Sequence, residues 1–141
     1  MIKTETSHFN RLIGVWKTTG QISIGNQALT LEGTDSYELI LNGNYILHKA
    51  DVLMGSEKTE TFEIIGLNNT TNKASMQYFN SKGESGTMTG EISGNNFRID
   101  GDKLKFNGII DDQSSVIRGK WFLQADDNSW KEFIEMKLEK L

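Results

Sequence analysis

Apolar and polar residues alternate with a period of two along most of this chain, from Val15 towards its end. The alternation runs in segments of about 6–12 residues, and short clusters of Gly, Asn and Asp separate them at the spacing of hairpin turns. Alternation of this kind is typical of β-strands that bury one face. The pattern therefore predicts a meander of about ten antiparallel strands.

Two local signals refine this picture. Phe9, Leu12 and Ile13 have helical spacing behind a Thr or Ser cap, which predicts one or two helical turns over residues 6–13. Asn42–Gly43 is the strongest hairpin signal, because asparagine and glycine both tolerate the positive φ angles of a type I′ turn.

A run of short antiparallel strands must protect its edges from other chains. A closed barrel and a two-sheet sandwich are the two economical ways to do so. Of the two we predict the barrel: an all-β fold, an antiparallel up-and-down barrel of about ten strands with a short N-terminal helix. The length of 141 residues fits one domain, so residues 1–141 are expected to form a single domain.

Strand parity predicts which side chains face the interior. The expected inward set is mostly apolar, and it includes Trp16, Leu31, Ile46, Phe62, Ile64, Met76, Phe97, Phe106, Trp121 and Trp130. A barrel of this size has more interior than its own side chains fill, so we expect a lumen with room for a small apolar molecule. Gly33 and Ala50 are small residues on the same face, where a larger side chain would fill that space.

The predicted inward face also carries four polar residues, Asp35, Tyr37, His48 and Tyr78. Buried polar groups need hydrogen-bond partners. They could form a structural or water-filled network, or they could orient the head of a ligand. The predicted ligand-binding residues are Trp16, Asp35, Tyr37, His48, Tyr78 and Trp121.

Composition excludes several classes of function. The formal net charge is −4 and no Lys/Arg-rich run occurs, so we expect no nucleic-acid partner. The chain has no cysteine, and its two histidines, His8 and His48, lack metal-site spacing, so we expect neither a metal nor another cofactor. The first residues contain no apolar stretch, and we therefore expect a cytoplasmic protein without a membrane span.

Gly14–Val15–Trp16 resembles the Gly-x-Trp signature of the lipocalins and other calycins. Over about residues 8–140 the chain is similar to a bacterial calycin-like family, the domain-of-unknown-function family numbered 1579. The motifs that carry the similarity are Phe9–Trp16, Tyr37–Tyr45, Ile64–Asn68, Gly119–Trp121 and Asp126–Trp130. The resemblance implies a ten-stranded barrel like those of fatty-acid-binding proteins and haem-binding nitrobindins, and it implies no established activity.

The wider resemblance makes two further expectations. The lipocalin pattern pairs the tryptophan of the first strand with an arginine on the closing strand, and the nearest candidate is Arg118, on the penultimate strand. Nitrobindin-like haem ligation implies a histidine near the C-terminal end of the barrel, where this chain has none, so we expect no haem.

Three functions follow from these observations. The favoured one is a binding module that holds a small hydrophobic or amphipathic ligand in the lumen. The second is a barrel enzyme in which Asp35 orients His48 for acid–base chemistry on an apolar substrate. The third is an interaction domain whose barrel is filled by its own side chains and holds no ligand.

Overall fold

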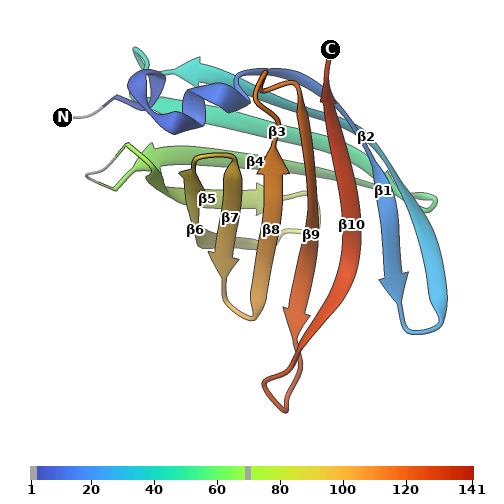
Figure 1. Ribbon diagram of the computed structural model, residues 1–141. Coiled ribbons are helices and arrows are strands. Elements are labelled where there is room, and N and C mark those ends of the chain that lie inside the picture. Colours follow the sequence, from blue (N-terminus) through green and yellow to red (C-terminus); the bar gives the residue numbers. More distant parts are fainter. Residues whose placement is uncertain (1–2, 69–70) are drawn as a thin grey trace.

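The computed structural model describes residues 3–68 and 71–141, and these form a closed antiparallel barrel (Figure 1). Each strand pairs with its neighbours in chain order, and the first strand also pairs with the last. This confirms the predicted up-and-down barrel. Its strands are β1 (Gly14–Ile24), β2 (Gln27–Ile40), β3 (Tyr45–Met54), β4 (Glu57–Leu67), β5 (Lys73–Asn80), β6 (Ser85–Ser93), β7 (Asn96–Gly101), β8 (Leu104–Ile110), β9 (Val116–Gln124) and β10 (Trp130–Lys140).

The predicted turn at Asn42–Gly43 joins β2 to β3. Leu41, Asn42 and Gly43 have φ angles of 51°, 61° and 78°, in the left-handed region that Asn and Gly tolerate best. The side-chain amide of Asn44 donates a hydrogen bond of 2.9 Å to the Leu41 carbonyl and closes the turn. The Asn–Gly signal therefore identified this hairpin correctly.

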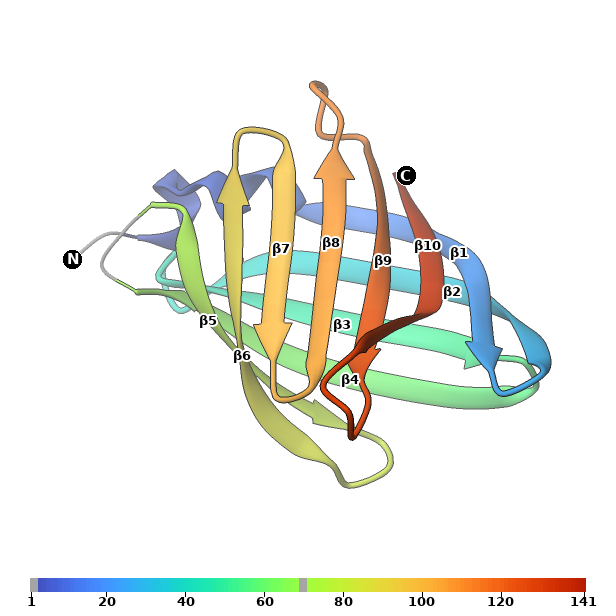
Figure 2. The same cartoon turned by 60° about the horizontal axis from the view of Figure 1, so that its bottom comes forward.

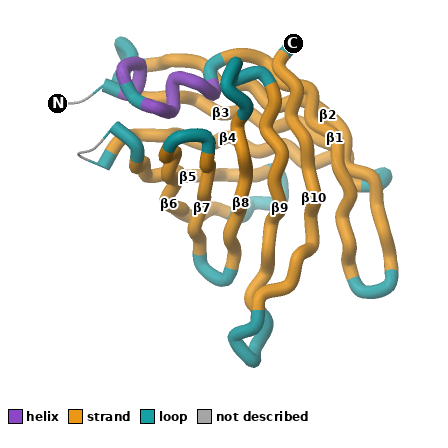
Figure 3. The backbone as a smooth tube through the Cα atoms, in the orientation of Figure 1, coloured by secondary structure: helices purple, strands orange, loops and turns teal. Residues whose placement is uncertain are grey.

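Two short 3₁₀-helices, η1 (Thr4–Thr6) and η2 (His8–Leu12), cover one end of the barrel (Figures 1 and 3). The helical spacing of the N-terminal segment is thus realised as tight 3₁₀ turns, and the Ser7 hydroxyl caps η2 by accepting a hydrogen bond from the Phe9 amide. Within residues 3–68 and 71–141, no helix is long and apolar enough to cross a membrane.

The helical end of the barrel is closed by a buried plug. Phe9, Leu12 and Trp16 have no exposed surface, and the Trp16 indole Nε1 donates a hydrogen bond of 2.8 Å to the Leu12 carbonyl. The turns that join β1 to β2, β3 to β4, β5 to β6, β7 to β8 and β9 to β10 lie at the opposite end (Figure 2). Any lumen between the strands therefore opens at the end away from the helices.

Lys140, and not an arginine, provides the cation beside Trp16. Lys140 lies opposite Trp16 in the β1–β10 register, and its ammonium lies 4.8 Å from the ring centroid. Arg118, the residue considered from the sequence, is exposed on the outer face of β9. Arg118 therefore does not take the place of the lipocalin arginine, and Lys140 on the closing strand holds the position over the ring.

Strand parity was right for most of the barrel but wrong for β4. Phe62 is 50% exposed, whereas Glu63 is 5% exposed and Ile65 is fully buried. Phe62 instead lies opposite Phe79 on the outer face, beneath the Lys49 ammonium. The inward face of β4 consequently carries Glu63 and not Phe62.

Trp130 also departs from the prediction. The register between β9 and β10 shifts between Glu132 and Ile134, where a β-bulge places an extra residue in β10. Because of the bulge, Trp130 does not share the inward face of β10 with Ile134. Trp130 is 40% exposed, and the Lys105 ammonium lies 4.2 Å from its ring centroid on the outside of the barrel.

Candidate functional site

The barrel contains a cavity of about 450 Å³ that reaches from its centre to the open end. Its lining from β7 to β10 is entirely apolar, whereas β1 to β5 and the β5–β6 turn contribute the polar groups. A cavity of this size and character suits a small ligand with an apolar body and a polar head. The polar lining residues are Thr18, Asp35, Tyr37, His48, Thr59, Thr61, Glu63, Tyr78, Asn80, Lys82 and Glu84.

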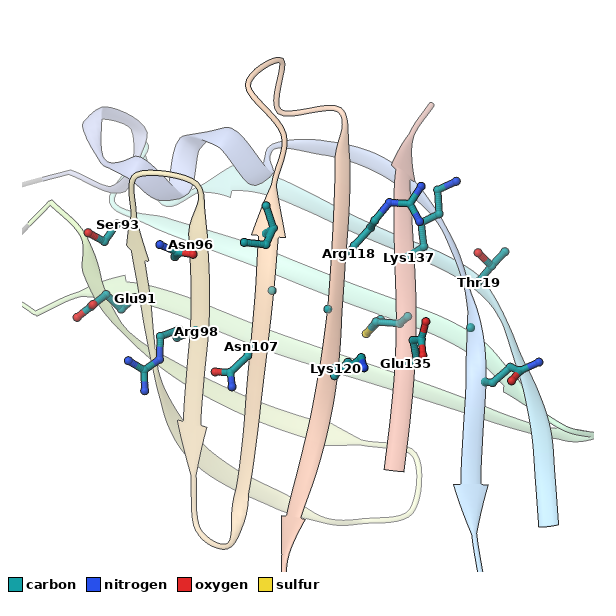
Figure 4. A pocket seen from close by; sticks show the side chains of 16 residues that line it. Thr19, Glu91, Ser93, Asn96, Arg98, Asn107, Arg118, Lys120, Glu135 and Lys137 are labelled. Carbon is teal, nitrogen blue, oxygen red and sulfur yellow. The ribbon is translucent and has the colours of Figure 1, made fainter. Parts of the chain in front are cut away.

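A wider hollow of about 920 Å³ lies on the outer face of β1 and β6 to β10 (Figure 4). Its side chains carry charges of both signs, such as Arg98, Lys120 and Glu135, and these three are exposed. Charges on an open surface are well solvated and screened, as in the pair of Lys120 with Glu132, 2.9 Å apart and exposed on both sides. The lumen, where charged groups are buried, is therefore the candidate site.

The polar side of the lumen centres on His48, which lies between two carboxylates. Its Nε2 is 2.6 Å from Asp35 Oδ1 and its Nδ1 is 2.9 Å from Glu63 Oε1. The other oxygen of Asp35, Oδ2, accepts a hydrogen bond from the Thr18 hydroxyl. We refer to Thr18, Asp35, His48 and Glu63 as the His48 cluster.

Strand register places Tyr37, His48, Glu63 and Tyr78 in one row across neighbouring strands, and Asp35 lies two residues from Tyr37 on β2, opposite Ala50. Tyr37 lies opposite His48, which lies opposite Glu63 on β4. Glu63 in turn lies opposite Tyr78, and Tyr78 opposite Gly86. A Cβ at Gly86 would lie 2.9 Å from the Tyr78 hydroxyl oxygen, so glycine leaves the space that the Tyr78 ring occupies. One polar row thus crosses four neighbouring strands.

The geometry makes His48 a cation. Carboxylate oxygens accept hydrogen bonds, so both ring nitrogens must carry hydrogens to satisfy Asp35 and Glu63. Burial lowers the pKa of His48, but the hydrogen bonds and charges of the two carboxylates outweigh it and raise the pKa from 6.5 to about 9. His48 is therefore protonated at neutral pH and holds the two acids together.

Tyr37 covers the imidazole ring of His48. The two rings are parallel within 9° and their centroids are 4.0 Å apart. Burial, followed by the nearby charges of Asp35 and Glu63, raises the pKa of Tyr37 well above its ordinary value, so its hydroxyl stays neutral. The stacked ring shields the imidazolium from water and favours its cationic form.

The pKa of His48 makes stability depend on pH. Because the folded protein keeps a proton that the unfolded chain releases near pH 6.5, this stabilisation is complete below pH 6.5 and is lost as the pH rises through about 9. The full contribution is about 3 kcal/mol, so the free energy of unfolding should fall by that amount between pH 6.5 and pH 9.5. Urea denaturation across this range would measure it.

The imidazole signal of His48, followed by NMR in a His8→Gln variant that contains no other histidine, would give the pKa directly. A midpoint near pH 6.5 would contradict the paired geometry.

Oxygen atoms without a partner face the lumen. The Thr59 hydroxyl is the one buried side-chain atom that makes no hydrogen bond among the described residues, and a buried polar group in that state costs about 1–3 kcal/mol. Glu63 Oε1 binds His48, and no described residue donates a hydrogen bond to Glu63 Oε2. These two atoms are therefore available to water or to a ligand.

The structure brings five of the six predicted ligand-binding residues together around one cavity, and these are Asp35, Tyr37, His48, Tyr78 and Trp121. Trp16 lies in the plug and does not line the cavity. Sequence reasoning missed Glu63, since parity on β4 was assigned from Phe62 and Ile64. A buried histidine with acidic residues on neighbouring strands was the signal that could have suggested it.

The geometry argues against His48 as a general base. Both of its nitrogens are engaged, and a residue protonated at neutral pH cannot accept a proton from a substrate. Among residues 3–68 and 71–141, no group of three or more His, Asp or Glu side chains is arranged to hold a metal ion. The His48 cluster can instead donate and accept hydrogen bonds and present negative charge to a bound molecule.

Comparison with known proteins agrees with the fold. A family described as "Protein of unknown function (DUF1579)" matches residues 3–140. No curated protein matches the sequence significantly. The crystal structure of Rv2717c from M. tuberculosis is similar with a TM-score of 0.75 and 7% sequence identity, over 100% of this chain and 99% of that chain. At this level of identity the similarity concerns the fold alone.

Proposed function

Because the chain belongs to the DUF1579 family, whose function is unknown, we propose its function from its own geometry: it binds a small amphipathic molecule in the barrel lumen. The observation that carries the proposal is a cavity of about 450 Å³ with one apolar wall and one polar wall. The residues proposed to contact the ligand are Asp35, Tyr37, His48, Glu63, Tyr78 and Trp121.

The apolar wall supplies the driving force. Each buried methylene group contributes about 0.8 kcal/mol, so a chain of eight to ten carbons gains roughly 6–8 kcal/mol before the costs of association. A polar head that pairs with the unpartnered groups of the lumen adds to this. We therefore expect dissociation constants in the micromolar range, which correspond to about 8 kcal/mol.

The two alternative functions have less support. An interaction domain with a filled barrel would leave no cavity of this volume beside buried charges. An enzyme that used His48 as a base would need a free ring nitrogen, and both are bound to carboxylates.

Filling part of the lumen should weaken binding. Ala50 lines the cavity, opposite Asp35 and Thr61 in the strand register, so Ala50→Leu places three more carbon atoms in the ligand's space. We expect the affinity for the neutral dye N-phenyl-1-naphthylamine to fall at least tenfold. Dye fluorescence and the emission of Trp121, which also lines the cavity, would report binding.

Ala28→Leu is the matched control, because Ala28 is exposed on β2 and the chemical change is the same. It should bind the dye as the wild type does. Gly33, the other small residue expected to face the lumen, is not a suitable position for filling it. A Cβ there would lie 2.2 Å from the Asp51 carbonyl oxygen and would distort the backbone. Absence of saturable binding by the wild type, or equal binding by Ala50→Leu, would overturn the proposal.

A further inference from the structure

In the His48 cluster, negative charges outnumber positive charges. The His48 cluster combines two buried carboxylates with one imidazolium, and both donors of that imidazolium are already used. Among the described lining residues the other cation is Lys82, in the β5–β6 turn at the open end, where its ammonium pairs with Glu57 at 3.3 Å. No unengaged cation therefore lies deep in the lumen to receive an anionic head.

Two oxygen atoms without a partner lie on β4, the strand that carries Glu63. Glu63 Oε2 accepts no hydrogen bond from the described residues, and Thr59, 7% exposed, has a hydroxyl without a partner. Glu63, Thr61 and Thr59 follow one another along the inward face of β4 in steps of about 7 Å, from the His48 cluster towards the open end. β4 thus offers a line of oxygen acceptors that leads inward to a free carboxylate oxygen.

We propose that the lumen selects amphipathic amines, molecules with an apolar chain and a protonated amino head, over carboxylic acids of the same length. The inference rests on the proposed binding function and names the chemistry of its ligand. The ammonium head pairs with Glu63 Oε2 beside the ring of Tyr78, and the chain lies against the apolar wall of β7 to β10.

The selectivity follows from charge and from hydrogen-bond type. An ammonium group has three donors and no acceptor, so it complements a lone carboxylate oxygen and the threonine hydroxyls. A carboxylate head at the same place would face Asp35 and Glu63 as like charges in a buried site, where repulsion is less screened than on the surface. A neutral alcohol can donate one hydrogen bond to Glu63 but gains no charge pairing.

The test compares 1-decylamine, 1-decanol and decanoate at pH 7 by displacement of N-phenyl-1-naphthylamine and by calorimetry. Decylamine should bind the wild-type protein at least tenfold more tightly than decanoate, with decanol between them. In Glu63→Gln the affinity for decylamine should fall at least tenfold, while that for decanol changes less than threefold.

Glu60→Gln is the matched control, because it removes the same charge from the protein. Glu60 lies on the same strand but is exposed. It should leave all three affinities unchanged. The wild-type ligand series tests the inference even if Glu63→Gln does not fold.

The outcomes separate the two proposals. If decanoate binds as tightly as decylamine, or more tightly, the inference is overturned and the binding function stands. If Glu60→Gln weakens decylamine binding as much as Glu63→Gln does, the preference arises from overall charge and the inference is also overturned. If none of the three displaces the dye and none gives a saturable signal, the binding function fails and the inference fails with it.

Discussion

Replacing His48 by glutamine should lower the free energy of unfolding at pH 7 by about 3–5 kcal/mol, because it leaves two buried carboxylates without the cation that joins them. Asp35 and Glu63 are each 5% exposed, so water cannot take over the role of the imidazolium. Urea denaturation of the variant and the wild type under identical conditions would measure the loss.

The destabilisation should depend on the acids. In His48→Gln, the additional change Glu63→Gln removes one of the two like charges, so the double variant should be more stable than His48→Gln alone. His8→Gln is the control for the substitution itself: His8 is exposed and its ring contacts the Ile92 carbonyl at 3.0 Å, so we expect a loss below about 1 kcal/mol. A loss of similar size in His48→Gln would show that the cluster does not depend on a buried imidazolium.

The barrel could be predicted from the sequence because each of its causes is local. Period-two alternation and short turns specify strands, and ten hairpin-linked strands protect their edges by closing. The turn at Asn42–Gly43 was predictable for the same reason, since two neighbouring residues determine its backbone. The short N-terminal helix was also predictable from local spacing, but its 3₁₀ type was not, because the choice between 3₁₀ and α depends on how its short turns dock on the barrel.

The candidate site could be predicted only in part. Parity placed Asp35 and His48 on the inward face, but it carries no information about height along the barrel. Height depends on the register of β2, β3 and β4, which the turns between them set. The ion pairs of His48 therefore became visible only when the strands were paired.

Glu63 was missed for a different physical reason. Assigning the apolar residues of a strand to its inner face fails where the outer face also carries apolar pairs, as Phe62 does with Phe79. Both rings are 50% exposed and shield one another, so they do not need the core. The inward face of β4 consists of polar residues, Thr59, Thr61 and Glu63, which line the lumen. From the sequence alone this face therefore resembled one exposed to solvent.

Trp16→Ala should destabilise the protein by about 3–5 kcal/mol, because it removes the largest fully buried side chain and leaves a cavity in the plug. The loss includes the hydrogen bond from the indole Nε1 to the Leu12 carbonyl at 2.8 Å and the contact of the ring with the Lys140 ammonium. Trp16→Phe keeps much of the packing and should lose less. Chemical denaturation of both variants would give the two values.

Trp130→Ala makes the same chemical deletion on the outer face and is the matched control. Trp130 is 40% exposed beyond the bulge in β10, and its closest charged contact is Lys105, at 4.2 Å from the ring centroid. An exposed cation–π contact contributes about 0.5–1 kcal/mol, so this variant should lose far less stability than Trp16→Ala. Equal losses would mean that η2 and Trp16 do not close the barrel as a packed plug. A large loss at Trp16 alone would show that the helical end of the barrel is closed by a packed core.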